Sequence, residues 1–285
     1  MKATVPVSEV ILLFLCRLCA LLAITLLPTI LTLVAYSGAP VLSLHFLTSL
    51  WQQNAITQGG ILAPIIGTVM IGIGVMIVSF PLGVATAVFL TEYSSHSGWQ
   101  RIIQLAIRNL AGVPSVVYGL FGLAVFAQAL HLGSTLLSAV LTLSIMTLPW
   151  IISASVEALE TVPVAFRESS LALGATPGQT VWRIVLPSAL PGCITGGILG
   201  VARALGETAP IILVGAAFYL SSFSPGLLSP FMALPYHTFI LATQHASPAA
   251  PAFAAGTALT LIVLTFLLSL GAIMIRYRFR VQKDW

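Results

Sequence analysis

Long apolar stretches alternate along the chain with short segments that carry its charge. A helix needs about 20 mainly apolar residues to cross a bilayer. The pattern therefore predicts six membrane helices, at about residues 10–36, 61–90, 110–130, 135–156, 192–215 and 252–275. The predicted fold class is all-α, with one polytopic transmembrane domain over residues 1–285.

Two of the intervening segments carry no charge and are expected on the outer side of the membrane. Residues 36–60 contain the polar sequence Trp51–Gln52–Gln53–Asn54. Residues 216–251 contain an apolar core, LLSPFMALPYHTFIL, which Pro230 and Pro235 interrupt. Because this core is too short and too interrupted to cross the bilayer, we expect an outside loop with an interfacial or re-entrant piece.

Composition and charge agree with a membrane protein and set its orientation. The chain is 58% apolar and 6% charged, with a mean hydropathy of +1.07, whereas soluble domains carry about 25% charged residues. Ten of the eleven Lys and Arg residues lie in four segments: 2–17, 92–108, 157–183 and 276–284. The predicted helices between these segments form hairpins, so all four segments are expected on the same side of the membrane. Basic residues beside membrane helices favour the cytoplasm. Both termini and the loop 157–190 are therefore expected there, and the net charge of +4 needs no nucleic-acid partner.

No arrangement of residues typical of catalysis or metal binding occurs in the sequence. The histidines are scattered over different loops and helix ends, and the three cysteines are expected to be structural thiols: His45, His96, His131, His237 and His245, with Cys16, Cys19 and Cys193. There is no Ser–His–Asp set, paired carboxylates or glycine-rich phosphate loop. We expect no metal, no cofactor and no enzymatic activity in this chain.

The loop 157–190 is predicted to contain two short helices. The first runs from Pro163, whose missing N–H is harmless in a first turn, to a stop at Gly174. The second begins with Thr176–Pro177–Gly178–Gln179, a capping box, and is expected to end near Leu186–Pro187. Ser169 and Ser170 are small enough for another surface to approach closely. An amphipathic loop that lies on the membrane is the alternative.

The spacing of Glu168–Ser169–Ser170, Gly174 and Ile184–Val185–Leu186–Pro187 resembles the EAA motif of the MetI-like permeases of ABC importers. Two serines replace the two alanines of that motif. The resemblance implies that this loop docks on a separate ATP-binding subunit. In that arrangement Glu168, Ser169 and Ser170 make the contact, with Glu168 as a charged anchor, and Gly174 provides the bend.

A second feature is the charged pair Arg203 and Glu207 inside the predicted helix 192–215. Small residues recur there every four positions, which lets another helix approach closely in lipid: Gly192, Gly196, Gly200, Ala204 and Thr208. The pair lies roughly 18–24 Å from the cytoplasmic end of the helix, at 1.5 Å per residue. Gly206 and Pro210 bracket Glu207 and predict a kink. Arg203, Glu207 and Thr208 are thus predicted to face a polar pathway; the alternative is a buried ion pair that fixes helix register.

Two further stretches narrow the resemblance. ARALGETAP (202–210) and NLAGVPSVVYGLFGL (109–123) are similar to the phosphate-specific ABC importer permeases. LPWIISASVEALETVP and the tail IRYRFR resemble the A-type (PstA-like) subunit more than the C-type, although Trp150 is unusual and the 216–251 loop matches poorly.

The resemblance implies a set of partners in a bacterial or archaeal inner membrane. These are a second, PstC-like permease, two PstB-like subunits that bind ATP and Mg, and an extracytoplasmic PstS-like phosphate-binding protein. Arg203 would contact the anion, and Glu207 would balance and position it. Other oxyanions (molybdate, tungstate or sulfate), a secondary transporter that uses the Arg203/Glu207 pair, and a non-transporting scaffold are the alternatives.

Overall fold

The computed structural model describes residues 7–52, 56–94, 98–220 and 226–280, and it is helical throughout, with no strand in those ranges. Gln53, Asn54, His96 and the charged residues Lys2, Lys283 and Asp284 lie outside the described residues. The predicted all-α class is confirmed.

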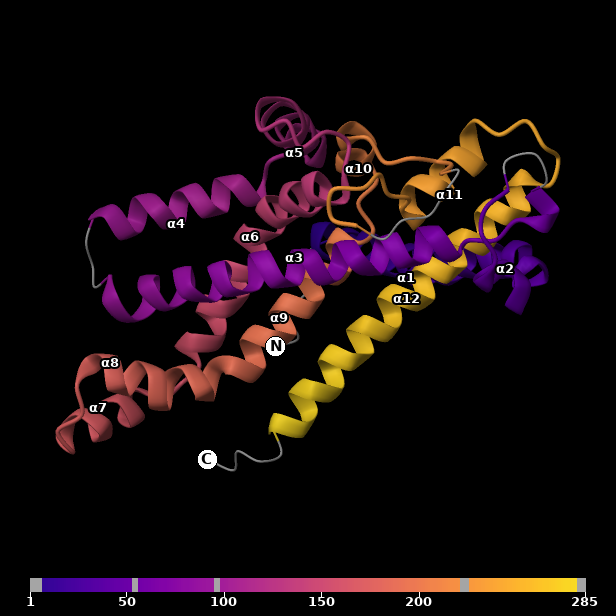
Figure 1. The fold of residues 1–285 in the computed structure, drawn as a ribbon. Helices are drawn as coiled ribbons and strands as arrows, with labels where there is room; N and C mark the ends of the chain where they lie inside the picture. The colour runs from indigo at the N-terminus through magenta and orange to yellow at the C-terminus, as the bar shows by residue number, and fades with distance from the viewer. Residues whose placement is uncertain (1–6, 53–55, 95–97, 221–225, 281–285) are drawn as a thin grey trace.

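Twelve α-helices are labelled in the described part of the chain (Figure 1). They are α1 (Val7–Gly38), α2 (Leu44–Thr48), α3 (Leu62–Val88), α4 (Gly98–Ala111), α5 (Ser115–Gly122), α6 (Leu136–Glu160), α7 (Val164–Ala172), α8 (Pro177–Thr180), α9 (Leu186–Ala204), α10 (Ala209–Val214), α11 (Leu234–Thr243) and α12 (Ala250–Arg280). Short 3-10 segments occur at η1 (Ala39–Val41) and η2 (Ile56–Gln58), and π-helical segments at η3 (Phe89–Tyr93), η4 (Leu123–Ala129) and η5 (Val181–Val185).

Five helical stretches of the described chain are long and apolar enough to cross a membrane: 11–41, 62–93, 136–160, 177–204 and 250–278. A sixth arises if the bent pair Gln100–Ala111 and Ser115–Ala129 is one crossing. Helices α1, α3, α6 and α12 correspond to the predicted ranges 10–36, 61–90, 135–156 and 252–275, with ends that differ by a few residues.

The predicted helix 110–130 is wrong in its first part, because the chain turns sharply at Gly112–Pro114. The stretches before and after this turn differ in direction by 98°. Pro114 has no N–H to donate, and its ring disfavours the helical conformation for the residue before it. The Tyr118 hydroxyl donates to the carbonyl of Leu110 (2.9 Å) and so supplies a partner at the end of α4.

The predicted helix 192–215 is also wrong, because α9 ends at Ala204 and α10 begins at Ala209. Pro210 therefore does not kink a continuous helix; it lies in the first turn of α10, where its missing N–H costs nothing. At the other end, the second helix of the loop does not stop at Leu186–Pro187. It continues through η5 and α9 to Ala204.

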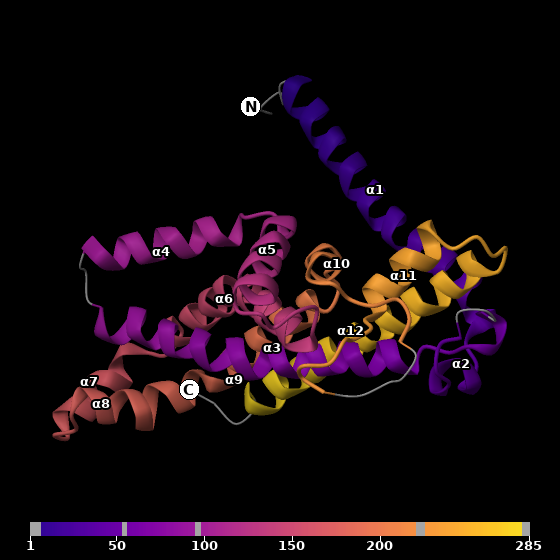
Figure 2. The same ribbon diagram turned by 45° about the horizontal axis from the view of Figure 1, so that its top comes forward.

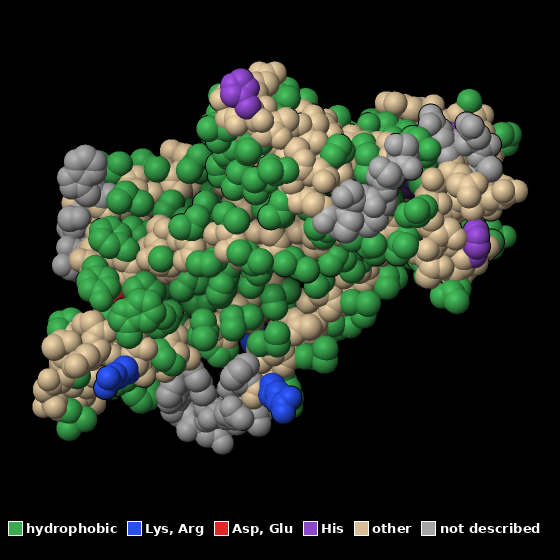
Figure 3. All heavy atoms as spheres, viewed as in Figure 1, with side chains coloured by type: hydrophobic (Ala, Val, Ile, Leu, Met, Phe, Trp, Pro, Cys, Tyr) green, Lys and Arg blue, Asp and Glu red, His purple; other side chains and the backbone are tan. Residues whose placement is uncertain are grey.

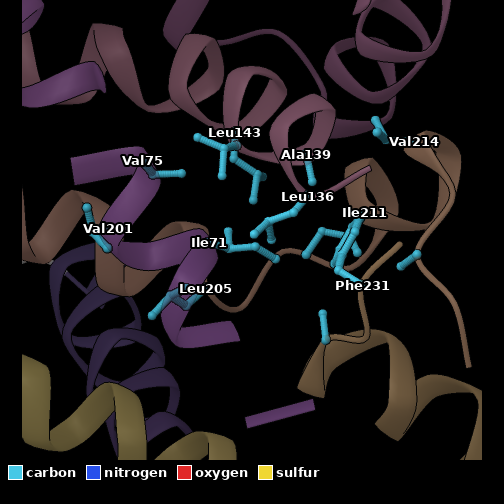
Figure 4. Packing of buried hydrophobic residues seen from close by; sticks show 13 residues of the cluster. Ile71, Val75, Leu136, Ala139, Leu143, Val201, Leu205, Ile211, Val214 and Phe231 are labelled. Carbon is cyan, nitrogen blue, oxygen red and sulfur yellow. The ribbon is translucent and has the colours of Figure 1, made fainter. Parts of the chain in front are cut away.

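The interior of the bundle is formed where α3, α6 and α9 pack together (Figure 1). Its largest buried apolar cluster joins these helices to α10 and to the segment before α11. Figure 4 shows the side chains converging from the separate elements: Ile71, Val75, Leu136, Ala139, Leu143, Val201, Leu205, Ile211, Val214 and Phe231.

Helix α1 projects away from this bundle (Figure 2). Its described side chains are mostly exposed. Helix α1 packs mainly on α12, and at the C-terminal end of α1 Gly38 lies against the backbone of Ala255 and Gly256. Hydrophobic side chains also cover most of the face seen in Figure 3, while basic side chains on that face lie around α7–α8 and the C-terminal part of α12. An apolar exterior of this extent suits contact with lipid or with other membrane helices.

Candidate functional site

The loop after α6 forms a compact helical hairpin at one end of the molecule, far from α2 and α11 (Figures 1 and 2). Gly174 lies between α7 and α8 with a φ of +85°, a conformation that side-chain-bearing residues rarely adopt. The N–H groups of Gly174 and Ala175 donate to the carbonyls of Leu171 and Ser170 at the end of α7. Gly174 therefore makes the bend between the two helices.

The capping box that opens α8 is confirmed. The Gln179 N–H donates to Thr176 Oγ1 (3.3 Å), and the Thr176 N–H donates to Gln179 Oε1 (2.9 Å). Two N–H groups that a helix start leaves unpaired are thereby satisfied. Residues 176–179 alone therefore determine where the long helical stretch that ends at Ala204 begins.

Ser170 was predicted to contact a docking partner, and the structure contradicts this. Its side chain is buried, with 5% of its surface exposed, and its Oγ forms a hydrogen bond with Thr180 Oγ1 (2.8 Å). Because α8 folds back over this side of α7, Ser170 joins the two helices and is closed to a partner. Glu168 and Ser169 are exposed, and beside them the Leu173 side chain is 89% exposed.

Arg167 anchors the hairpin to the rest of the protein, a role that the sequence pattern did not reveal. Its Nε donates to both carboxylate oxygens of Glu92 in η3 (3.2–3.3 Å), and its Nη2 lies 2.8 Å from Glu92 Oε1. Its guanidinium also donates to the carbonyls of Val162 (2.7 Å) and Leu159 (3.1 Å). Arg167 thus joins α7 to the ends of α3 and α6. The sequence signal that could have indicated this contact is Glu92, the first acidic residue after a long apolar helix.

The four-residue spacing of small residues on α9 brings this helix close to α6. A Cβ added at Gly192 would lie 2.7 Å from Ala158 Cβ, and one added at Gly196 would lie 2.5 Å from Ala154 Cβ. One turn further, a Cβ at Gly200 would lie 3.1 Å from Trp150 Cδ1. The two backbones approach closely because side chains are absent at these positions.

Arg203 and Glu207 lie on either side of the break between α9 and α10, and they form no ion pair. The N–H groups of Gly206 and Glu207 donate to the carbonyls of Arg203 and Ala204 (3.1 Å each), which closes the last turn of α9. Arg203 and Gly206 are exposed, while Glu207 and Thr208 are half-buried. The alternative of an Arg203–Glu207 ion pair that fixes helix register is therefore wrong.

The guanidinium of Arg203 instead lies over an aromatic ring. Its Cζ is 5.2 Å from the ring centre of Trp150 on α6. The Trp150 side chain is 47% exposed, so both members of this pair are open. The exposed arginine lies at the break between α9 and α10 and forms no ion pair with a carboxylate of the described residues, which suits it to contact an anion.

A histidine is enclosed among aromatic rings at the opposite end of the molecule. His237 on α11 stacks on Phe218 (ring centres 4.8 Å apart) and meets Trp51 edge-on (4.5 Å). Both of its ring nitrogens and Trp51 Nε1 are buried without a hydrogen-bond partner. Burial, and next the nearby His245, lower the pKa of His237 from its ordinary 6.5 to about 3. His237 is therefore neutral at physiological pH.

The segment 216–251, for which we expect an interfacial or re-entrant piece, contains the short helix α11. Helix α11 is held against α3, because the Leu234 N–H donates to Thr68 Oγ1 (2.9 Å) and the backbone at Met232 lies against Gly67. Among the described residues, no three His, Cys, Asp or Glu side chains are grouped so that they could hold a metal ion.

Comparisons with known proteins agree with the helical arrangement. The model of the family described as "Binding-protein-dependent transport system inner membrane component" matches residues 79–281. The chain is 30% identical over 267 residues to the probable ABC transporter permease protein YqgI of Bacillus subtilis, with 90% of each chain covered. It is 35% identical over 223 residues to the phosphate transport system permease protein PstA 1 of Mycobacterium tuberculosis (strain H37Rv); the match covers 77% of this chain and 70% of that protein.

Two solved transporters share the fold. The MetNI methionine ABC transporter in an inward-facing conformation has a chain that matches with a TM-score of 0.63 and 19% identity, covering 77% of this chain and 95% of its own. A bacterial alginate ABC transporter, solved with a periplasmic protein bound to an alginate pentasaccharide, matches with a TM-score of 0.65 and 15% identity over 94% of each chain. From these comparisons, the chain belongs to the binding-protein-dependent transport system inner membrane component family and is a multi-pass permease subunit of an ABC transporter.

Proposed function

We propose that this permease forms one half of the transmembrane pathway of an ATP-driven importer for inorganic phosphate. The main support for phosphate as the substrate is the 35% sequence identity, over most of the chain, to a PstA phosphate permease. The exposed Arg203 at the break in the pathway helix supports it, because a planar guanidinium fits a tetrahedral oxyanion through paired N–H donors.

The complete importer that we propose has a PstC-like second permease, two PstB-like subunits that bind ATP and Mg, and an extracytoplasmic PstS-like binding protein, in a bacterial or archaeal plasma membrane. Both chain termini and the α7–α8 hairpin face the cytoplasm, and residues 216–251 face outward. The ATPase docks on the exposed side of α7, at Glu168 and Ser169, where Leu173 adds apolar area. Ser170 and Gly174 act indirectly, by setting the shape of the hairpin.

Phosphate passes Arg203 without being held tightly. One arginine gives a limited number of charge-assisted hydrogen bonds, and the Glu207 carboxylate, four residues away along the chain, repels a dianion. A pathway must release its substrate as readily as it accepts it. Thr208 offers a hydroxyl beside the pair, and selection among anions belongs mainly to the binding protein.

Uptake of labelled phosphate by the reconstituted complex tests this function. We expect ATP-dependent uptake that excess unlabelled phosphate removes and that excess sulfate or molybdate leaves in place. Competition by sulfate or molybdate as strong as that by phosphate would instead assign another oxyanion. Flux without ATP through the purified chain would assign a secondary transporter.

The pathway role of Arg203 has its own test. Arg203→Gln should abolish uptake while the complex still assembles, because it removes the charge and the paired donors. Arg101→Gln, at an exposed arginine of α4, is the matched control and should transport normally. Normal uptake by the Arg203 variant would exclude the residue from the pathway.

A further inference from the structure

We propose that Trp150 is a positioning residue that holds the guanidinium of Arg203 by its flat face and leaves the N–H groups free for the transported anion. The inference rests on the proposed function, since that function makes an oxyanion the ligand of Arg203. It assigns a role to an aromatic residue of α6 that does not itself contact the anion.

The arrangement depends on three positions. Trp150 comes from α6 and Arg203 from the last turn of α9, with the guanidinium carbon 5.2 Å from the ring centre. Gly200 lies three residues before Arg203, on the same side of the helix. Because a Cβ at Gly200 would lie only 3.1 Å from Trp150 Cδ1, the glycine gives the indole the space to reach the guanidinium.

An aromatic ring and a carboxylate hold an arginine in different ways. A ring attracts a cation that lies over its face within about 6 Å, and this contact uses no N–H donor. A carboxylate pairs with the edge of the guanidinium and occupies the donors that an anion would need. A ring therefore fixes the position of an arginine and preserves its capacity to bind an oxyanion.

Both arrangements occur in this chain. Arg167 bonds to Glu92 and to the carbonyls of Val162 and Leu159, so its Nε, Nη1 and Nη2 are all engaged in a structural contact. The Arg203 guanidinium has no hydrogen bond or ion pair to another residue in the described ranges, and its side chain is exposed. Arg167 thus holds the fold together, whereas the N–H groups of Arg203 stay available for an anion.

The contact also suits the depth in the membrane that the sequence predicts for Arg203. A charged side chain inside a membrane is costly. Attraction to the Trp150 ring offsets part of this cost without neutralising the charge. The guanidinium therefore keeps its full attraction for a passing anion.

The test measures phosphate uptake by the reconstituted complex with Trp150 replaced. Trp150→Leu should lower uptake roughly tenfold, a loss between those expected when a cation–π contact is removed from an exposed site and from a desolvated one. Trp150→Phe keeps an aromatic face and should restore uptake to within about threefold of the parent. Phe266→Leu, an aromatic-to-leucine change at a 60% exposed position of α12, controls for altered lipid packing and should transport normally.

A double substitution separates action through the guanidinium from simple packing. Arg203→Lys keeps the charge but lacks the flat, forked group that stacks on a ring. In that background Trp150→Leu should lower the remaining uptake by less than about threefold. An undiminished tenfold loss would overturn the proposal, as would parental uptake by Trp150→Leu or a Trp150→Phe variant as impaired as Trp150→Leu. If Arg203→Gln transports normally, the pathway role proposed above fails as well; if it is inactive while Trp150→Leu is normal, this inference alone fails.

Discussion

Arg167 and Glu92 are 75 residues apart in the sequence, and their side chains form a bidentate ion pair. This pair connects the α7–α8 hairpin to the segment that follows α3. The Glu92 side chain is 9% exposed and that of Arg167 is 22% exposed, so the pair is partly shielded from water. Hydrogen bonds to charged groups contribute about 1.5–3 kcal/mol each when they are made away from solvent. The hairpin is therefore fixed to the membrane helices by the side chain of Arg167 as well as by the covalent chain.

We predict that Arg167→Ala loosens the hairpin and lowers both ATPase co-purification and transport. Glu92→Gln should have a smaller effect, because Arg167 keeps its bonds to the carbonyls of Leu159 and Val162. Amide hydrogen exchange over residues 164–185 measures the loosening directly. Arg183→Ala is the control, as an exposed arginine outside the ion pair. Unchanged exchange in Arg167→Ala would show that the ion pair does not hold the hairpin.

The exposed side of α7 gives a second prediction. Glu168→Lys should reduce the amount of ATPase that co-purifies with the permease severalfold, because it reverses a charge on the proposed docking surface. Glu160→Lys makes the same change at an exposed residue at the end of α6 and should leave co-purification unchanged. Equal recovery of ATPase from both variants, with equal transport, would exclude Glu168 from the docking surface.

The contact between α9 and α6 can be tested with a compensating pair. Gly196→Ala should destabilise the folded chain by about 1–3 kcal/mol, because the new methyl group would lie 2.5 Å from Ala154 Cβ. Adding Ala154→Gly removes that methyl group and should restore most of the lost thermal stability of the detergent-solubilised protein. Gly271→Ala, where nothing lies within 4 Å of the added methyl group, should not destabilise. Failure of Ala154→Gly to compensate would place the strain elsewhere.

His237 makes stability depend on pH in a defined direction. Its pKa is about 3 in the folded protein and about 6.5 in an unfolded chain. Between these values the unfolded chain binds a proton that the folded chain does not, so stability falls as pH falls from about 6.5 toward 3 and is unaffected above that window. Thermal melting between pH 7 and pH 4 should show this slope, and His237→Gln should flatten it. His45→Gln changes an exposed histidine and should leave the slope in place; a parental slope in His237→Gln would assign it to other groups.

Features set by residues near one another in the chain could be predicted from the sequence. The capping box of Thr176 and Gln179 needs only four residues, and the long apolar runs are enough to predict α1, α3, α6 and α12. The positive φ of Gly174 also agrees with its expected place after a helix end.

Features that depend on packing between distant segments could not be predicted in this way. The ion pair of Arg167 joins positions 75 residues apart, and the burial of Ser170 depends on where α8 folds. The break before α10 has a similar origin. A Cβ at Gly119 of α5 would lie 2.8 Å from Pro210 Cα, so α10 packs closely on another helix instead of continuing the direction of α9.

The unbroken helical stretch from Pro177 to Ala204 has a mechanical consequence. It begins at the capping box of the α7–α8 hairpin and ends one residue after Arg203, a length of about 42 Å at 1.5 Å per residue. A tilt of the hairpin would move this helical stretch as one body and would shift the guanidinium of Arg203 with it. Because Val201 and Leu205 share a buried cluster with Ile211 and Val214, the same movement would also reach α10 across the break at residues 205–208.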